Sequence, residues 1–174
     1  MKLINENINH KFERNKSGKI DSLGIGKISL IKIWLNDHEI ENYIINDDFS
    51  IDVIGSVDLQ FQNISEIPLY IQFGNIRGNF KLGRSSMKTL KGLPRWVQLN
   101  VRIFNDNLSS LKYAPDEIDG VFSIVFYNDI DKLEWSPKFI YKLQIKMPKN
   151  DIIEKELKFL HKNGQIKNLE ITYI

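Results

Sequence analysis

Residues 90–118 read LKGLPRWVQLNVRIFNDNLSSLKYAPDEI, and this stretch decides the predicted fold. Within it, Val101 and Ile103 are apolar residues at alternate positions, which is the pattern of a β-strand with one buried face. Pro115 follows Pro94 after 21 residues. Similar segments lie on both sides, so that residues 55–147 can be laid over themselves at a spacing of 21 to 23 residues. A fixed period of this length predicts a repeat protein.

The repeat consists of units that begin at Gly55, Gly78, Leu99, Gly120 and Tyr141. In each unit the residues two and four positions after the start are apolar: Val57 and Leu59, Phe80 and Leu82, Val101 and Ile103, Phe122 and Ile124, and Leu143 and Ile145. Each unit is predicted to form one strand, one turn and one short irregular return. Such a unit is too small to bury its own apolar face, so the units are expected to stack into a solenoid.

Two kinds of residue recur after the strands. An amide or hydroxyl side chain comes eight residues after the start of a unit, at Asn63, Ser86, Asn107 and Asn128. Such a side chain can hydrogen-bond backbone groups in a tight bend. A proline recurs at Pro94, Pro115 and Pro137, which suits an extended return with few hydrogen-bond donors. We interpret the regular positions of the repeat as structural.

The quoted stretch resembles the leucine-rich repeats of bacterial type, whose pattern is roughly L-x-x-L-P-x-x-L-x-x-L-x-V-x-x-N-x-L-x-x-L. The matching residues, in order, are Leu90, Leu93, Pro94, Val97, Val101, Asn107, Leu108 and Leu111. As a whole-chain arrangement, residues 28–140 are similar to small leucine-rich-repeat-like proteins of phages, prophages and their bacterial hosts. Departures from the pattern are Ser86 in place of Asn, Leu99 in place of Gly, an extra residue near Asp129, and Ile71 in place of Pro. The resemblance implies a solenoid fold, but leucine-rich repeats serve many unrelated recognition tasks.

The flanking segments are predicted to cap the open ends of the stack. Residues 27–36 place Ile28, Ile31 and Leu35 on one helical face, with Leu30 and Trp34 beside it, and residues 42–53 alternate as expected for a hairpin around 46–48. At the other end Asn150 or Asp151 can cap a helix, in which the apolar residues Ile153, Leu157 and Leu160 recur. Gly164 favours the end of this helix. Residues 165–174 then alternate as expected for a final strand.

We therefore predict an α/β fold, a short leucine-rich-repeat-like solenoid with a parallel sheet of about five repeat strands. A helix and hairpin cap its N-terminus, and a helix and strand cap its C-terminus. The segments are an N-terminal segment and cap at 1–54, the repeat array at 55–147 and the C-terminal cap at 148–174, all in one folding unit. Residues 1–26 have the weakest pattern, and partial disorder is the alternative left open for them.

Composition narrows the chemistry. The chain has 174 residues, 42% of them hydrophobic and 26% charged, as in ordinary globular domains. It has no cysteine, which excludes a thiolate nucleophile, a zinc knuckle and an iron–sulfur cluster. The net charge is only +2, but residues 79–112 carry 7 basic and 1 acidic side chains, a local charge of +6. The polar N-terminus favours a cytoplasmic protein, and no membrane partner is expected. If a phage encodes the chain, the expected compartment is the cytoplasm of the host.

No motif predicts a catalytic, metal or cofactor site. His10, His38 and His161 are spread along the chain without ligand spacing and are interpreted as surface residues. The segment at 24–29, GIGKIS, departs from a phosphate-binding loop at two required positions. Acidic residues recur in two neighbouring units, at Asp116, Glu117, Asp119, Asp129, Asp131 and Glu134. A cluster of their carboxylates that binds a cation is one interpretation. Roles in turns and in solubility are the favoured one.

The outward side chains of the repeat strands are expected to form columns, because neighbouring strands lie about 4.8 Å apart. The first column contains Ser56, Asn79, Asn100, Val121 and Lys142; the second Asp58, Lys81, Arg102, Ser123 and Gln144; the third Gln60, Gly83, Phe104, Val125 and Lys146. Arginine, lysine and an exposed aromatic residue are typical interface anchors. The predicted binding surface comprises Asn79, Lys81, Asn100, Arg102, Phe104, Lys142 and Lys146. A solvated face without a partner is the alternative, and Trp96, Tyr113 and Trp135 are expected to pack on the return side.

Non-catalytic recognition of another protein is the favoured function. Given the resemblance, the specific hypothesis is a phage-encoded accessory factor that binds and inhibits or redirects a host protein, such as a defence component. One alternative is nucleic-acid binding, or interference with a nucleic-acid-guided complex, through residues 79–112. A virion or assembly role is another. An enzyme similar to bacterial effectors that join such repeats to a ubiquitin-ligase domain is disfavoured, because those ligases use a cysteine nucleophile.

Overall fold

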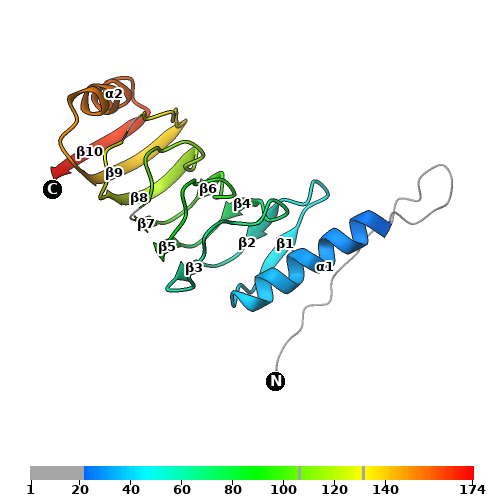
Figure 1. Ribbon diagram of the computed structural model, residues 1–174. Coiled ribbons are helices and arrows are strands. Elements are labelled where there is room, and N and C mark those ends of the chain that lie inside the picture. The colour runs from blue at the N-terminus through cyan, green and yellow to red at the C-terminus, as the bar shows by residue number, and fades with distance from the viewer. Residues whose placement is uncertain (1–21, 106, 131) are drawn as a thin grey trace.

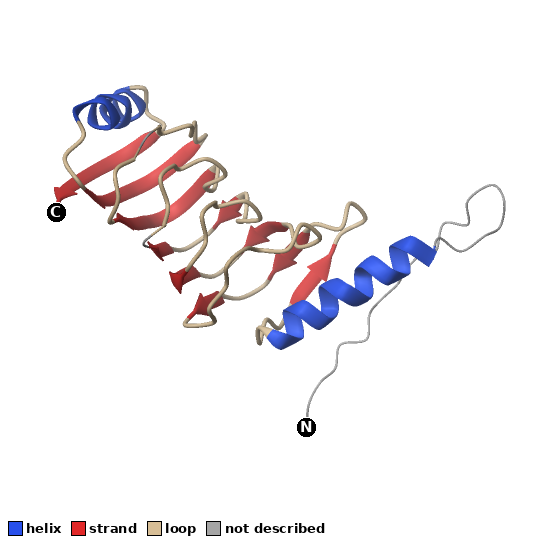
Figure 2. Cartoon of the chain, in the orientation of Figure 1, coloured by secondary structure: helices blue, strands red, loops and turns tan. Residues whose placement is uncertain are grey.

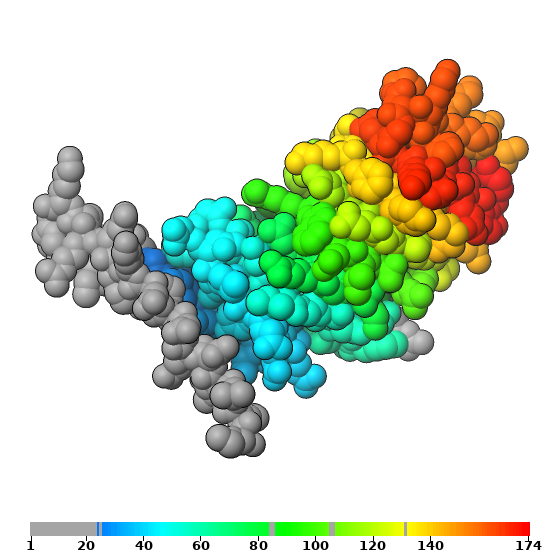
Figure 3. Space-filling model, turned by 180° about the vertical axis from the view of Figure 1, so that it is seen from behind, coloured from blue at the N-terminus to red at the C-terminus, as the bar shows by residue number. Residues whose placement is uncertain are grey.

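The computed structural model describes residues 22–105, 107–130 and 132–174, which form a mostly β solenoid (Figures 1 and 2). Successive turns stack along one axis, and the colours of the space-filling view follow one another along it from the N-terminal to the C-terminal side (Figure 3). In this described part of the chain, ten strands belong to one continuous sheet. Helix α1 (Ser22–Asp37) lies at one end of the stack and helix α2 (Asp151–Lys162) at the other (Figure 1).

The first side of the sheet contains the predicted repeat strands. They run parallel, in the order β3 (Val57–Gln60), β5 (Phe80–Ser85), β7 (Val101–Asn105), the second half of β8 (Glu117–Phe126), the second half of β9 (Phe139–Met147) and most of β10 (Ile166–Tyr173). The residues two positions into each unit lie in register and are fully buried: Val57, Phe80, Val101, Phe122 and Leu143. The predicted strand positions and their register are therefore confirmed.

The return segments form a second side of the sheet, which was not predicted from the sequence. Its strands are β2 (Ile51–Val53), β4 (Phe73–Ile76), β6 (Trp96–Val97) and the first halves of β8 and β9, again parallel. Ile76, Val97 and Ile118 on these strands are fully buried, so the returns add to the core. The predicted irregular return is wrong, because the returns contribute strands to the same sheet. Within the described residues that sheet has ten strands, with returns and caps included, so a sheet of about five repeat strands is not confirmed, and the fold is mostly β instead of α/β.

The recurrent prolines lie just before these second-side strands. Pro94, Pro115 and Pro137 each stand two residues before the first residue of β6, β8 and β9, respectively. The residue after each proline continues the pairing, because Arg95 N–H donates to the Gly74 carbonyl at 2.9 Å. A proline at the entry of a strand removes no hydrogen bond that the sheet needs.

Backbone segments of neighbouring turns come very close where the two sides of the sheet meet. A methyl group at Gly78 would lie 2.5 Å from the carbonyl carbon and oxygen of Gly55. At Gly120 it would lie 2.3 Å from the carbonyl oxygen of Leu99. Only glycine permits this approach without a backbone shift. Packing at the corner of the solenoid thus explains the glycines that start the units at 78 and 120, but not Gly55, where a methyl group would meet no atom within 4 Å.

Helix α1 covers the first turn of the stack. It spans Ser22–Asp37 and is longer than the helix predicted at 27–36, so residues 22–26 are helical. Ile31, Trp34 and Leu35 are buried, whereas Leu30 is half-exposed. The ring of Trp34 meets Phe73 of β4 edge-on, with 6.2 Å between the ring centroids. The remaining part of the segment for which disorder was left open, residues 1–21, lies outside the described residues.

The predicted hairpin and C-terminal cap are both present. Strand β1 (Tyr43–Ile45) pairs antiparallel with β2. Helix α2 begins after Asn150, whose side-chain oxygen accepts two backbone N–H groups of the first helical turn at 3.1 Å. Ile153, Leu157 and Leu160 of α2 are buried, and the chain leaves the helix through Gly164 at φ +78°. Neither helix in the described part of the chain is long and apolar enough to cross a membrane.

Candidate recognition surface

The outward side chains of β3, β5, β7, β8, β9 and β10 form what we call the outer strand face. Its second column contains six residues in register: Asp58, Lys81, Arg102, Ser123, Gln144 and Glu170. The third column runs as predicted from Gln60 through Phe104 to Lys146. The register prediction holds because the repeat length keeps equivalent residues side by side. Glu170 was not placed in the column by the sequence analysis.

A depression of about 330 Å³ lies in the outer strand face. Four residues of the predicted binding surface line it: Asn79, Lys81, Asn100 and Arg102. Ser123 and Gln144 complete its floor on the next two strands. The other three predicted residues, Phe104, Lys142 and Lys146, belong to the same face but not to the lining of this depression.

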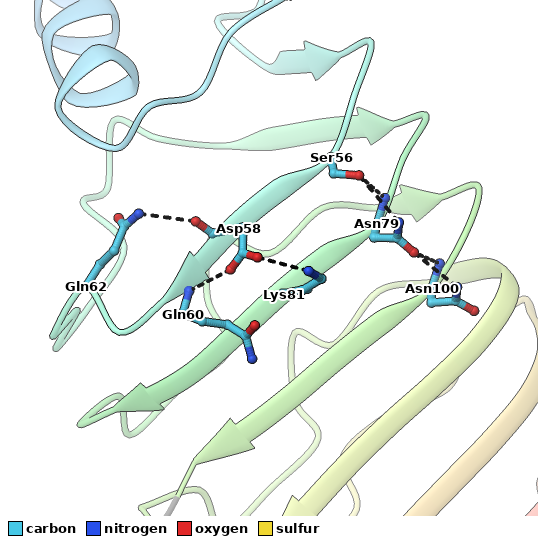
Figure 4. Close-up of polar contacts among 7 residues, drawn as sticks. All are labelled: Ser56, Asp58, Gln60, Gln62, Asn79, Lys81 and Asn100. Carbon is cyan, nitrogen blue, oxygen red and sulfur yellow. Dashed lines mark hydrogen bonds and ion pairs between the residues drawn. The ribbon is translucent and has the colours of Figure 1, made fainter.

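The first column forms a ladder of polar side chains across the turns (Figure 4). Ser56 Oγ accepts the Asn79 backbone N–H at 3.0 Å, and Asn79 Oδ1 accepts the Asn100 backbone N–H at 3.2 Å. Asn100 Oδ1 in turn accepts the backbone N–H of Val121 at 2.9 Å. These side chains satisfy backbone donors at the corner of the solenoid. Asn79 and Asn100 therefore have a structural role in addition to any contact with a partner.

The cations of the outer strand face differ in their surroundings. Lys81 Nζ lies 3.0 Å from the Asp58 carboxylate, and Figure 4 shows this pair beside the ladder. Lys142 Nζ lies 3.0 Å from Glu170. Hydrogen bonds from Gln144 and Lys142 hold the pKa of the Glu170 carboxyl below its ordinary value. Among the described residues, no carboxylate pairs with Arg102.

Phe104 is less accessible than predicted. An exposed aromatic residue was expected from the sequence, but Phe104 is only partly exposed, and Val125, its register partner on the neighbouring strand, is only 9% exposed. The guanidinium carbon of Arg102 lies 5.9 Å from the centroid of the Phe104 ring. The two side chains thus form a cation–π contact on the outer strand face. Lys146, in the same column, is exposed.

The basic residues of the 79–112 segment do not form one surface. Lys81 and Arg102 line the depression on the outer strand face. Lys91 and Arg95 line a separate depression of about 270 Å³ on the return side, beside the exposed Leu69 and Tyr113. The local charge of +6 is therefore divided between different sides of the solenoid.

The tryptophans of the return segments pack as expected. Trp135 is buried, and its Nε1 donates to the Pro115 carbonyl at 3.1 Å. Trp96 is partly buried, and its Nε1 donates to Asp119 at 3.2 Å. Tyr113, which was expected to pack there too, is half-exposed with φ +69°.

Other candidate chemistry is not assembled in the described residues. No group of three or more histidines and carboxylates is placed there to hold a metal ion, and Asp131 of the predicted acidic set, like His10, lies outside them. Gly24, Gly26 and Lys27 of the phosphate-loop-like segment lie within α1. His38 Nδ1 lies 2.7 Å from the Trp34 carbonyl oxygen, so this histidine is tied to the end of α1.

One surface was missed by the sequence analysis. A depression of about 500 Å³ lies between α2 and the segment 133–136. Trp135 and Phe159 contribute to its lining, and Phe159 is 62% exposed. Ile152 and Phe159 recur at i and i+7 on α2, which is a helical signal for a second apolar stripe.

Comparison with protein-family models, with curated proteins and with solved structures finds no match to this chain.

Proposed function

We propose that this chain is a non-catalytic protein-recognition module that binds a partner through the outer strand face. The depression lined by Lys81, Arg102, Ser123 and Gln144 carries the proposal. It brings together cationic, hydroxyl and amide side chains from four neighbouring strands, next to a cation–π pair. Arginine and aromatic residues supply much of the binding energy at protein interfaces.

The rigidity of the scaffold supports this function. Each side chain of the outer strand face stands on a parallel strand whose inner residues, such as Leu82, Ile103 and Ile124, are fully buried. The strand backbone that carries the anchor residues is consequently held by the packed core before a partner arrives. A preorganised surface loses less conformational entropy on binding than a flexible loop does.

The proposed family is that of leucine-rich-repeat-like proteins of phages and bacteria. It is supported by the burial of the pattern's apolar positions Leu90, Leu93, Val97, Leu108 and Leu111. On this basis the partner would be a bacterial host protein, met in the host cytoplasm and inhibited or redirected by binding. A virion or assembly role is the alternative for the same surface.

Site-specific photo-crosslinking tests the recognition function. A photoreactive phenylalanine replaces Ser123 in the depression and, in a matched control, the exposed Lys155 on α2. Both variants are irradiated in bacterial cells that express the chain. We expect a crosslinked protein of discrete mass from position 123 alone, and its loss when Arg102→Glu is added. Identical crosslinking at both positions, or none at position 123, would contradict the proposal.

Nucleic-acid binding is the second candidate, favoured by the cations Lys81 and Arg102 in one depression. It predicts affinity for DNA or RNA that falls steeply with salt, because counterions are released when phosphates are neutralised. Titration of labelled single-stranded and double-stranded DNA and RNA at low and high salt tests it. Absence of binding at low salt would remove this candidate.

A further inference from the structure

Arg102 is the central cation of the outer strand face. Within its column it lies between Lys81 on β5 and Ser123 on β8. Both outer lysines, Lys81 and Lys142, are neutralised by carboxylates at the two ends of the face. Arg102 has no such partner in the described part of the chain; its neighbour is the Phe104 ring. The described part of the face therefore presents an open positive charge at Arg102, between the ion pairs of Lys81 and Lys142, and a further exposed cation, Lys146, in the third column.

The groups around Arg102 suit a carboxylate. A guanidinium binds a carboxylate through two parallel N–H···O bonds, which a lysine ammonium does not reproduce. Ser123 is in register with Arg102 on the adjacent strand, about 4.8 Å away, and supplies a hydroxyl donor. The Asn100 amide, in the same depression, donates one N–H to Asn79 and has a second N–H. Donors from these three side chains thus line one depression.

An apolar surface lies beside this cluster of donors. Phe104 follows Arg102 by two residues on the same side of β7, which places the two side chains about 7 Å apart. The ring remains partly accessible. A ligand that reaches Arg102 with a carboxylate can thus cover Phe104 with a neighbouring apolar side chain.

We infer that the outer strand face binds an acidic peptide segment of its partner, with an aspartate or glutamate paired to Arg102 and a nearby apolar side chain on Phe104. This inference rests on the proposed recognition function and narrows it to one class of partner. Its basis is charge complementarity with the Arg102 guanidinium, which pairs with no described carboxylate and lines a depression of donors.

The same charge pattern argues against nucleic acid at this face. A phosphate backbone is tracked by several free cations in a row. Here Lys81 and Lys142 are already paired, and the carboxylates of Asp58 and Glu170 at the ends would repel phosphates. Lys91 and Arg95, which could extend a basic path, line the depression on the return side.

Fluorescence anisotropy with defined probes tests the inference. The first probe is a labelled decapeptide that carries Glu-Gly-Leu twice, the second is the same peptide with lysine in place of glutamate, and the third is a 20-nucleotide oligo(dT). We expect the full chain to bind the glutamate peptide in preference to both others. Arg102→Glu should weaken binding at least tenfold, Arg102→Lys should weaken it less, and the matched charge reversal Lys155→Glu on α2 should change it less than twofold.

The outcomes separate the two proposals. Arg102 is exposed, so its variants are expected to fold, and circular dichroism checks this. Failure of the glutamate peptide to bind, or equal binding by wild type and Arg102→Glu, overturns the inference. Crosslinking at position 123 together with that failure would leave the recognition function standing with another class of partner. Oligo(dT) binding that Arg102→Glu abolishes would assign the face to nucleic acid and overturn the inference as well.

Discussion

The indole Nε1 of Trp135 donates a hydrogen bond to the backbone carbonyl of Pro115, 3.1 Å away and one turn earlier in the solenoid. Both residues are buried, and the Trp135 ring also meets Phe122 edge-on, at 5.7 Å between centroids. Trp135→Phe keeps an aromatic ring but leaves the Pro115 carbonyl without this donor. We expect a loss of about 1–3 kcal/mol in the free energy of unfolding, measured by urea denaturation.

Trp96→Phe is the matched control for this experiment. The Trp96 indole donates to the exposed carboxylate of Asp119, which water can solvate instead. Its replacement should change the unfolding free energy by no more than about 0.5 kcal/mol. Equal losses in the two variants would show that the buried hydrogen bond to Pro115 is not what stabilises the return side.

The close approach at Gly78 predicts a large effect of a single methyl group. Gly78→Ala places its Cβ about 2.5 Å from the Gly55 backbone, so the two turns must separate. We expect a loss of about 2 kcal/mol or more, measured by denaturant unfolding. Gly55→Ala adds the same methyl group where no atom lies within 4 Å and should be nearly neutral. A tolerated alanine at position 78 would contradict the packing at the corner.

The polar ladder predicts that Asn79 matters for stability. Asn79→Ala removes the oxygen that accepts the Asn100 backbone N–H and side-chain amide. We expect a loss of about 1 kcal/mol in thermal or denaturant unfolding. Gln98→Ala, at an exposed position in the same turn, serves as the control and should have little effect. Equal unfolding free energies for the two variants would contradict the structural role of Asn79 in the ladder.

A pH titration can test the contact between α2 and β10. Hydrogen bonds from Lys158 and from the Tyr173 hydroxyl hold the pKa of the Glu154 carboxyl below its ordinary value. Because that pKa is lowered in the folded chain, the contact contributes stability above the ordinary pKa of glutamate and loses it as the pH falls through the lowered value. Tyr173→Phe removes one donor and should raise the Glu154 pKa.

Carboxyl-carbon NMR measures this shift directly. The Glu170 pKa, lowered by Gln144 and Lys142, is an internal reference that should stay constant in Tyr173→Phe. Glu154 titration that does not respond to the substitution would mean that Tyr173 and Glu154 are not joined in solution.

The sequence was most informative where the chain repeats. Alternation at Val101 and Ile103, copied at a constant spacing, specified the first-side strands and the columns of their outward residues. The ends of α2 were predicted at Asn150 or Asp151 and at Gly164, because capping depends on local chemistry, and the cap is Asn150. The second-side strands were not predicted from the sequence. Strand β6, for example, has only two residues, which is too short to show a period.

The candidate site was predictable in its membership but not in its electrostatics. Register alone placed Arg102 beside Lys81. That Lys142 is neutralised depends on Glu170, which follows a whole helix later and whose pairing no local pattern reveals. The partial burial of Phe104 likewise depends on the packing of neighbouring strands, which no local pattern reveals.

Strand pairing is unequal along the solenoid. β8, β9 and β10 have 10, 9 and 8 residues, whereas β4 has four and β6 only two. A turn of a solenoid contacts only its neighbours, so a break between two turns does not require the others to open. Pairing on the second side is thus shortest at β6, where two residues pair with β8, and the link between these turns rests mainly on the five paired residues of β7. We expect the turns before β6 to open before the C-terminal ones. A partner that contacts both Lys81 on β5 and Gln144 on β9 would link the turns on either side of β6 and oppose their separation.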